Sequence, residues 1–195
     1  MEITDSLNLA MPFGDGLYAY HTPISREVYV VNYAALNAAR AALASKGMYY
    51  YLESGPLIAG MTLRDEGLAE ARRRGNETDA RTPVLLDEIK RLTTILVPGA
   101  TGYDLLPVDV AISSGKVNPE DWQEVESALV FFTCLVPTAK RADRQARAEI
   151  TSRLLGGSIT SSTLTEYAAS LKTSTKEEPG AKDAPKAKAT SSIPL

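Results

Sequence analysis

The sequence is poor in the residues that build metal sites and covalent catalytic sites. Its 195 residues include one cysteine, Cys134, and one histidine, His21. A single cysteine excludes an intrachain disulfide, and one histidine beside it leaves a structural zinc site of the usual kind without ligands. This cysteine usage suits a reducing compartment such as the cytoplasm. We therefore expect no metal and no cofactor.

Long apolar runs and an excess of positive charge are also missing. The apolar stretch at residues 128–136 is too short to cross a bilayer, and no basic segment followed by an apolar run opens the chain. A formal charge of -3 and a pI near 5.3 give no general attraction to nucleic acid or to an anionic membrane. We expect a cytosolic protein without membrane partners, and nucleic acid binding would need a local basic patch.

The remaining composition, 44% apolar and 23% charged, fits one ordinary globular domain with a tail. Its organising stretch is residues 117–157. Asn118 and Pro119 are typical of a helix start, and Glu120 and Asp121 place negative charge at the positive end of the helix dipole. Large apolar side chains then recur at helical spacing and predict the centre of the core: Trp122, Val125, Leu129, Phe132 and Val136. Pro137 predicts a kink or break at residues 133–136.

The pattern as a whole predicts a mainly α fold, with a compact multi-helix domain at residues 22–172. Residues 1–21 alternate apolar and other residues around Gly14-Asp15-Gly16, which predicts a short β-hairpin or an extended arm. A helix is expected from Thr22-Pro23 to Lys46-Gly47, with a buried face formed by Ile24, Val28, Val31, Ala35, Ala38 and Ala42. Further helices are expected at residues 55–75, 82–95, in one or two turns after Pro107, and after the capping-box pair Thr163 and Glu166. Residues 173–195 contain no aromatic residue and almost no large apolar residue, so a disordered tail is predicted.

No combination of residues predicts an enzyme. His21 has no second histidine to complete a metal set, and Cys134 lies in an apolar run where burial raises a thiol pKa. The acidic cluster of Asp65, Glu66 and Glu70 precedes arginines and is typical of a solvated helix face with local ion pairs. The glycine pairs lack the lysine and the following serine or threonine of a phosphate-binding loop. We therefore expect a protein that works by binding.

Two stretches are candidate protein-binding surfaces. Three consecutive tyrosines, Tyr49, Tyr50 and Tyr51, form either a connector packed on the helices or an exposed aromatic patch. A basic helical run offers cations at helical spacing: Lys140, Arg141, Arg144, Arg147 and Arg153, opposed by Asp143 and Glu149. Such a run fits phosphates, an acidic protein partner or a plain solvated face.

Several segments together carry a resemblance to a known family. They are residues 21–28 (HTPISREV), 87–94 (DEIKRLTT), 106–109 (LPVD), 122–134 (WQEVESALVFFTC) and 158–174. In these segments, and in its layout of a helical domain followed by a polar low-complexity tail, the chain resembles the tail assembly chaperones of long-tailed phages. The resemblance covers about four-fifths of the chain, and it implies no catalytic or ligand residue.

The resemblance implies a factor that binds the long, helical, aggregation-prone tape measure protein and aids tail tube assembly. Many members of the family are also made in a longer, frameshifted form that recruits tail tube protein. A location in the host cytoplasm and absence from the mature virion follow from the same resemblance. Two other functions remain open: a virion structural protein, such as a connector or minor tail component, and a nucleic-acid-binding regulator.

Overall fold

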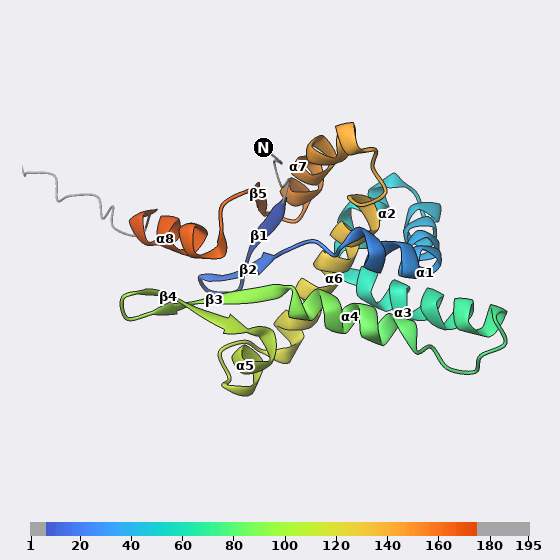
Figure 1. Ribbon diagram of the computed structural model, residues 1–195, viewed down its shortest axis with the longest axis horizontal. Coiled ribbons are helices and arrows are strands. Elements are labelled where there is room, and N and C mark those ends of the chain that lie inside the picture. Colours follow the sequence, from blue (N-terminus) through green and yellow to red (C-terminus); the bar gives the residue numbers. More distant parts are fainter. Residues whose placement is uncertain (1–6, 175–195) are drawn as a thin grey trace, which may run out of the picture.

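Five strands form one antiparallel sheet with the order β4-β3-β2-β1-β5 (Figure 1). The computed structural model describes residues 7–174, and eight α-helices lie in this part of the chain. The strands are β1 (Asn8–Phe13), β2 (Leu17–His21), β3 (Thr93–Gly99), β4 (Gly102–Pro107) and β5 (Ser158–Thr160). The fold is therefore mixed α/β, and the prediction of a mainly α fold was wrong.

The predicted N-terminal hairpin is present, but it lies inside the sheet. β1 pairs with β2 across the turn at residues 14–16, with Ala10 opposite Tyr20. β2 also pairs with β3, where Tyr18 faces Leu96, and β1 pairs with β5, where Leu9 faces Ile159. Residues 8–21 are thus tied to segments far away in the sequence, and they do not form an arm lying across helices.

The helix expected at residues 82–95 ends early, because its second half is strand β3. Helix α4 spans Arg81–Arg91, and β3 starts at Thr93. Leu92 and Ile95 continue the helical spacing of the residues before them, which led to the wrong prediction. The run of threonine, isoleucine and valine after Leu92 favours a strand, since β-branched side chains fit a pleated surface.

Both faces of the sheet are covered by helices. Alternate strand residues point to opposite faces, so Leu9, Ala19 and Ile95 join the main core with the central helices. Residues of the other parity, among them Tyr20 and Leu96, pack against helix α8 (Leu164–Ser174) in a second, smaller core. The predicted capping box starts α8, because Thr163 N donates to Glu166 Oε2 at 2.8 Å and Glu166 N donates to Thr163 Oγ1 at 3.4 Å.

Helix α6 (Pro119–Leu135) is the central helix of the molecule, as predicted (Figure 1). Asn118 caps it by accepting from Glu120 N at 3.0 Å. Trp122 and Phe132 are 6% and 1% exposed, so both rings lie in the core. The helix ends two residues before Pro137, and after a 3-10 turn (Arg141–Asp143) a separate helix α7 (Arg144–Leu154) follows.

The remaining helices are α1 (Arg26–Ser45), α2 (Met48–Glu53), α3 (Gly55–Arg73) and α5 (Val108–Ser113). α3 packs very closely on α6, since a Cβ atom on Gly55 would lie 2.8 Å from Phe131 Cε2. Helix α1 is capped by Ser25, whose hydroxyl accepts from Val28 N at 3.3 Å, so it begins at Arg26 and not at Thr22-Pro23 as predicted.

The buried face of α1 also differs from the prediction. Its buried residues are Tyr29, Leu36, Ala39 and Leu43, whereas Val31 of the predicted face is 62% exposed. An alanine-rich helix offers little contrast between its faces, so periodicity placed the buried side about one residue out of register. Because of this error, the sequence pattern places Val31 in the core, whereas the structure leaves it exposed in the groove described below.

Most of the predicted disordered tail at residues 173–195 lies outside the described residues. Of that segment the structure describes Thr173 and Ser174, which end α8. Within residues 7–174, no helix is both long and apolar enough to cross a membrane.

Candidate protein-binding groove

The two residues considered for catalysis are both buried and uncharged at neutral pH. Burial lowers the pKa of His21 to about 4, and burial raises the pKa of the Cys134 thiol to about 12. His21 Nδ1 lies 3.0 Å from Thr93 Oγ1, which itself donates to Ile89 O at 2.7 Å. Thr93 must therefore accept from His21 Nδ1–H, which places the ring proton on Nδ1. Within residues 7–174 no group of three or more His, Cys, Asp or Glu side chains is placed to hold a metal.

The three consecutive tyrosines lie on helix α2 and have different environments. Tyr49 is 76% exposed. Tyr50 is half-buried, with Lys46 Nζ 5.0 Å from its ring centroid. Tyr51 packs on Phe131 of α6, with ring centroids 5.1 Å apart. The packed alternative therefore describes Tyr51 and the exposed alternative describes Tyr49.

The basic run is not one helical face. Lys140 precedes the 3-10 turn, and α7 starts only at Arg144. Lys140 and Arg147 are exposed, Arg144 is half-buried, and the side chain of Arg141 lies outside the described residues. The structure thus separates residues that the sequence placed on a continuous basic helix.

An apolar groove between α1 and α4 is the most prominent candidate site, and the sequence did not predict it. It has a volume of about 650 Å³. Val31 on α1 and Val84 on α4 are 62% and 66% exposed and line the groove together with Val28 and Leu85. Exposed aliphatic side chains that gather between two helices are typical of surfaces that receive the apolar face of a partner helix.

The rim of this groove carries more free negative than positive charge. Glu88 pairs with Arg91 through two hydrogen bonds of 2.7 and 2.8 Å, and this pairing lowers the pKa of Glu88. Glu27 and Asp87 also line the groove, and neither has an ion-pair partner among the side chains that the structure describes. The remaining cation of the rim is Arg81. A partner segment with basic residues beside its apolar face would suit this rim.

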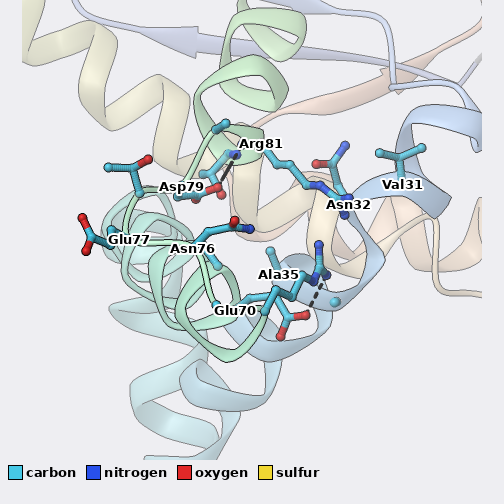
Figure 2. A pocket seen from close by; sticks show the side chains of 16 residues that line it. Val31, Asn32, Ala35, Glu70, Asn76, Glu77, Asp79 and Arg81 are labelled. Atoms are coloured by element: carbon cyan, nitrogen blue, oxygen red, sulfur yellow. Dashed lines mark hydrogen bonds and ion pairs between the residues drawn. The ribbon is translucent and has the colours of Figure 1, made fainter.

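A second, polar pocket adjoins the groove, and Figure 2 shows the side chains that line this pocket. The two share Val31, Asn32, Ala80 and Arg81, and the polar pocket has a volume of about 520 Å³. The loop at residues 75–80 forms one wall. Asp79 shapes this loop by accepting from the backbone amides of Arg81 and Thr82 at 2.9 and 3.2 Å. Partial burial alone would raise the pKa of Asp79, but the hydrogen bonds from Thr82 and Arg81 outweigh it and lower the pKa.

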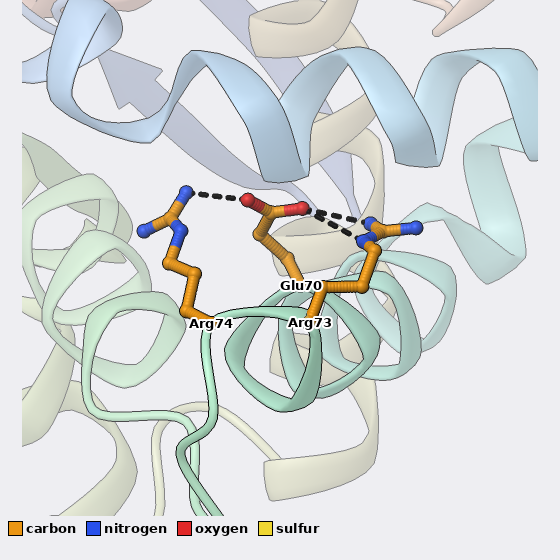
Figure 3. A network of polar contacts seen from close by, with 3 residues as sticks. All are labelled: Glu70, Arg73 and Arg74. Carbon is orange, nitrogen blue, oxygen red and sulfur yellow. Dashed lines mark hydrogen bonds and ion pairs between the residues drawn. The ribbon is translucent and has the colours of Figure 1, made fainter.

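The end of α3 forms the opposite wall of the polar pocket. Figure 3 shows Arg73 and Arg74 reaching the same carboxylate, that of Glu70. Arg74 Nη2 lies 2.6 Å from Glu70 Oε1, and Arg73 Nη2 lies 2.9 Å from Glu70 Oε2. The hydrogen bond from Arg74, with that from Arg73, lowers the pKa of Glu70. Glu70 thus forms local ion pairs of the kind predicted for this acidic cluster, and the two arginines share its single carboxylate.

Tight packing at Gly67 fixes the loop against α3. A Cβ atom on Gly67 would lie 2.0 Å from Thr82 Oγ1 and 2.3 Å from Asp79 Oδ2. No larger residue fits there unless the side chains of Thr82 and Asp79 move. The shape of the polar pocket thus depends on the contact of Gly67 in α3 with Asp79 and Thr82, which the sequence pattern does not predict.

No protein-family model, curated protein or solved structure matches this chain. The features of the molecule that bear on function are thus an exposed apolar groove on a mixed α/β scaffold and a histidine and a cysteine that are buried and uncharged.

Proposed function

We propose that this protein is a phage tail assembly chaperone that binds the tape measure protein through the groove between α1 and α4. The observation that carries the proposal is the pair Val31 and Val84, which lie on two neighbouring helices, line one groove, and are each more than 60% exposed. Covering an aliphatic side chain of this size stabilises a complex by about 1 kcal/mol or more.

The choice of partner is supported by the chemistry of the groove and by the family resemblance of the sequence. A tape measure protein is a long helical chain with apolar faces, which needs shielding before the tail tube assembles. An amphipathic helix laid in the groove would cover Val31 and Val84 and bring its flanking basic residues to Glu27 and Asp87.

The same proposal sets the place and time of action. The protein acts in the host cytoplasm and leaves the assembly before the mature virion forms. A longer frameshifted form would recruit tail tube protein to the same complex, which links shielding of the tape measure to polymerisation around it.

The direct experiment is co-expression of the tagged protein with the tape measure protein encoded in the same gene cluster, followed by affinity purification. The proposal predicts a soluble complex, and it predicts that purified virions lack this protein by mass spectrometry. Absence of a complex, together with normal tails from a phage that lacks the gene, would refute it. Detection in virions at a fixed copy number would instead indicate a connector or minor tail component. Salt-sensitive DNA binding would indicate a regulator.

A further inference from the structure

A separate pocket lies where helices α1 and α7 begin. Its volume is about 330 Å³, in the range of small-ligand sites. Most of its wall is apolar, formed by Leu7, Pro23, Ile24, Val30, Val136 and Pro137. Among the described lining residues, Arg26 and Arg144 are the two cations and there is no carboxylate.

Neither arginine is neutralised by a carboxylate in the part of the chain that the structure describes. No ion pair joins Arg26 or Arg144 to another residue within residues 7–174. The Nε atom of Arg144 is buried and has no hydrogen-bond partner among the described residues, although a buried polar group without a partner costs about 1–3 kcal/mol. Tyr29, which also lines the pocket, has a buried hydroxyl without a partner. The Nε–H donor of Arg144 is therefore available to pair with an acceptor on a bound ligand.

The positions of the two arginines in their helices strengthen this argument. Arg26 is the first residue of α1 and Arg144 is the first residue of α7. The N-terminus of a helix carries partial positive charge and disfavours a cation by about 0.3–1 kcal/mol. Two such unfavourable placements meet at one pocket, and an anion bound between them would relieve both.

We propose that this pocket binds a carboxylate carried on an aliphatic group, such as the terminal residue of a polypeptide that ends in leucine. The guanidinium groups of Arg144 and Arg26 would pair with the carboxylate, and the apolar wall around Ile24 and Val136 would hold the side chain. This site is distinct from the groove between α1 and α4, and it does not rest on the function proposed above.

The test uses the full-length protein and a matched pair of probes, N-acetyl-leucine and N-acetyl-leucine amide, followed by nuclear magnetic resonance shifts of backbone amides. We expect saturable shifts at residues 22–30 and 136–144 with the acid, and binding at least tenfold weaker with the neutral amide. Inorganic phosphate serves as a third probe, because an oxyanion without an aliphatic group should bind more weakly than the acid.

Three variants complete the test. Arg144→Gln should weaken N-acetyl-leucine binding about tenfold or more, and Arg26→Gln, at an exposed position, should weaken it without a loss of folding. Arg153→Gln, at an exposed position in the last turn of α7, is the matched control and should leave binding unchanged. Equal binding of acid and amide, stronger binding of phosphate than of the acid, or normal binding by a folded Arg26→Gln protein would each overturn the proposal.

Discussion

The ring of Tyr51 packs on the ring of Phe131, with centroids 5.1 Å apart and planes inclined by 51°. Phe131 is fully buried on the central helix, so this contact fastens the short helix α2 to the core. Tyr49 lies two residues earlier, about 200° around the helix, and projects into solvent. Neighbouring tyrosines of one motif therefore have opposite roles.

The first prediction concerns these two tyrosines. Tyr51→Ala should lower the free energy of unfolding by about 2 kcal/mol or more, because it removes a partly buried aromatic ring from Phe131. Tyr49→Ala should change it by less than about 0.5 kcal/mol, as expected for an exposed site. Urea denaturation of both variants measures the difference. Equal losses would show that the packing at α2 is wrong.

The second prediction concerns the titration of His21. Its imidazole should titrate near a pKa of 4, well below the usual 6.5, because burial of the ring disfavours its charged form. The chain has one histidine, so the proton and carbon shifts of that single ring report the titration without overlap. A pKa near 6.5 in the folded protein would contradict the burial of β2.

This titration also sets a dependence of stability on pH. Above pH 6.5 the ring is neutral in both the folded and the unfolded chain, so it adds nothing to the pH dependence of the free energy of unfolding. Between pH 6.5 and about 4 the unfolded chain binds a proton that the folded chain does not, so stability falls as the pH falls, by about 3 kcal/mol over that interval. His21→Gln should remove this part of the slope. An unchanged slope in that variant would assign the acid sensitivity to other groups.

The third prediction concerns Cys134. Its thiol is buried and its pKa is raised to about 12, so it should not react with a disulfide reagent in the folded protein at pH 8. The same thiol should react completely in urea. Absorbance of the released thiolate measures both rates. Fast reaction under native conditions would mean that α6 is exposed.

The fourth prediction concerns the close contact at Gly67. Alanine favours a helix over glycine by about 1 kcal/mol at an open position, but Gly67→Ala should destabilise the protein, because the new methyl group meets Thr82 Oγ1 and Asp79 Oδ2. The melting temperature of this variant, measured by thermal unfolding, shows whether the substitution stabilises or destabilises the protein. A higher melting temperature would show that the loop at residues 75–80 does not pack on α3 as described.

The central helix and its caps could be predicted from the sequence because they depend on local signals. Asn118-Pro119 and the pair Thr163 and Glu166 each satisfy amides within three residues, and the prediction agrees with the hydrogen bonds at both places. The stripe through Trp122 and Phe132 repeats over several turns, so its burial follows from periodicity alone.

The sheet could not be predicted as a whole because its pairing is not local. β5 has three residues and joins Asn8 to Thr160 across most of the chain. β3 follows α4 with one intervening residue, and the apolar residues at Leu92 and Ile95 fit a helix as well as a strand. The β-branched residues after Leu92 favour a strand, but pairing with β2 and β4 decides it, which is a tertiary effect.

The groove was missed for a similar reason. Val31 was assigned to the buried face of its helix, and Val84 lies beside the apolar stripe of Leu85, Leu86 and Ile89. Helical periodicity assigns apolar residues to the faces of a helix, but it does not show which of them remain exposed to solvent after the helices pack. A signal did exist: Val28, Tyr29, Val30 and Val31 follow one another, and four consecutive apolar residues cannot all lie on one helix face.

The most direct test of the proposed function is the affinity of the tape measure protein for the double variant Val31→Gln and Val84→Gln. Glutamine keeps the helix propensity and removes the aliphatic surface, so binding should weaken at least tenfold with no loss of folding. Val110→Gln, at another exposed valine outside the groove, is the control and should bind like the wild type. If the double variant binds the partner as tightly as the wild type, the groove between α1 and α4 is not the binding site.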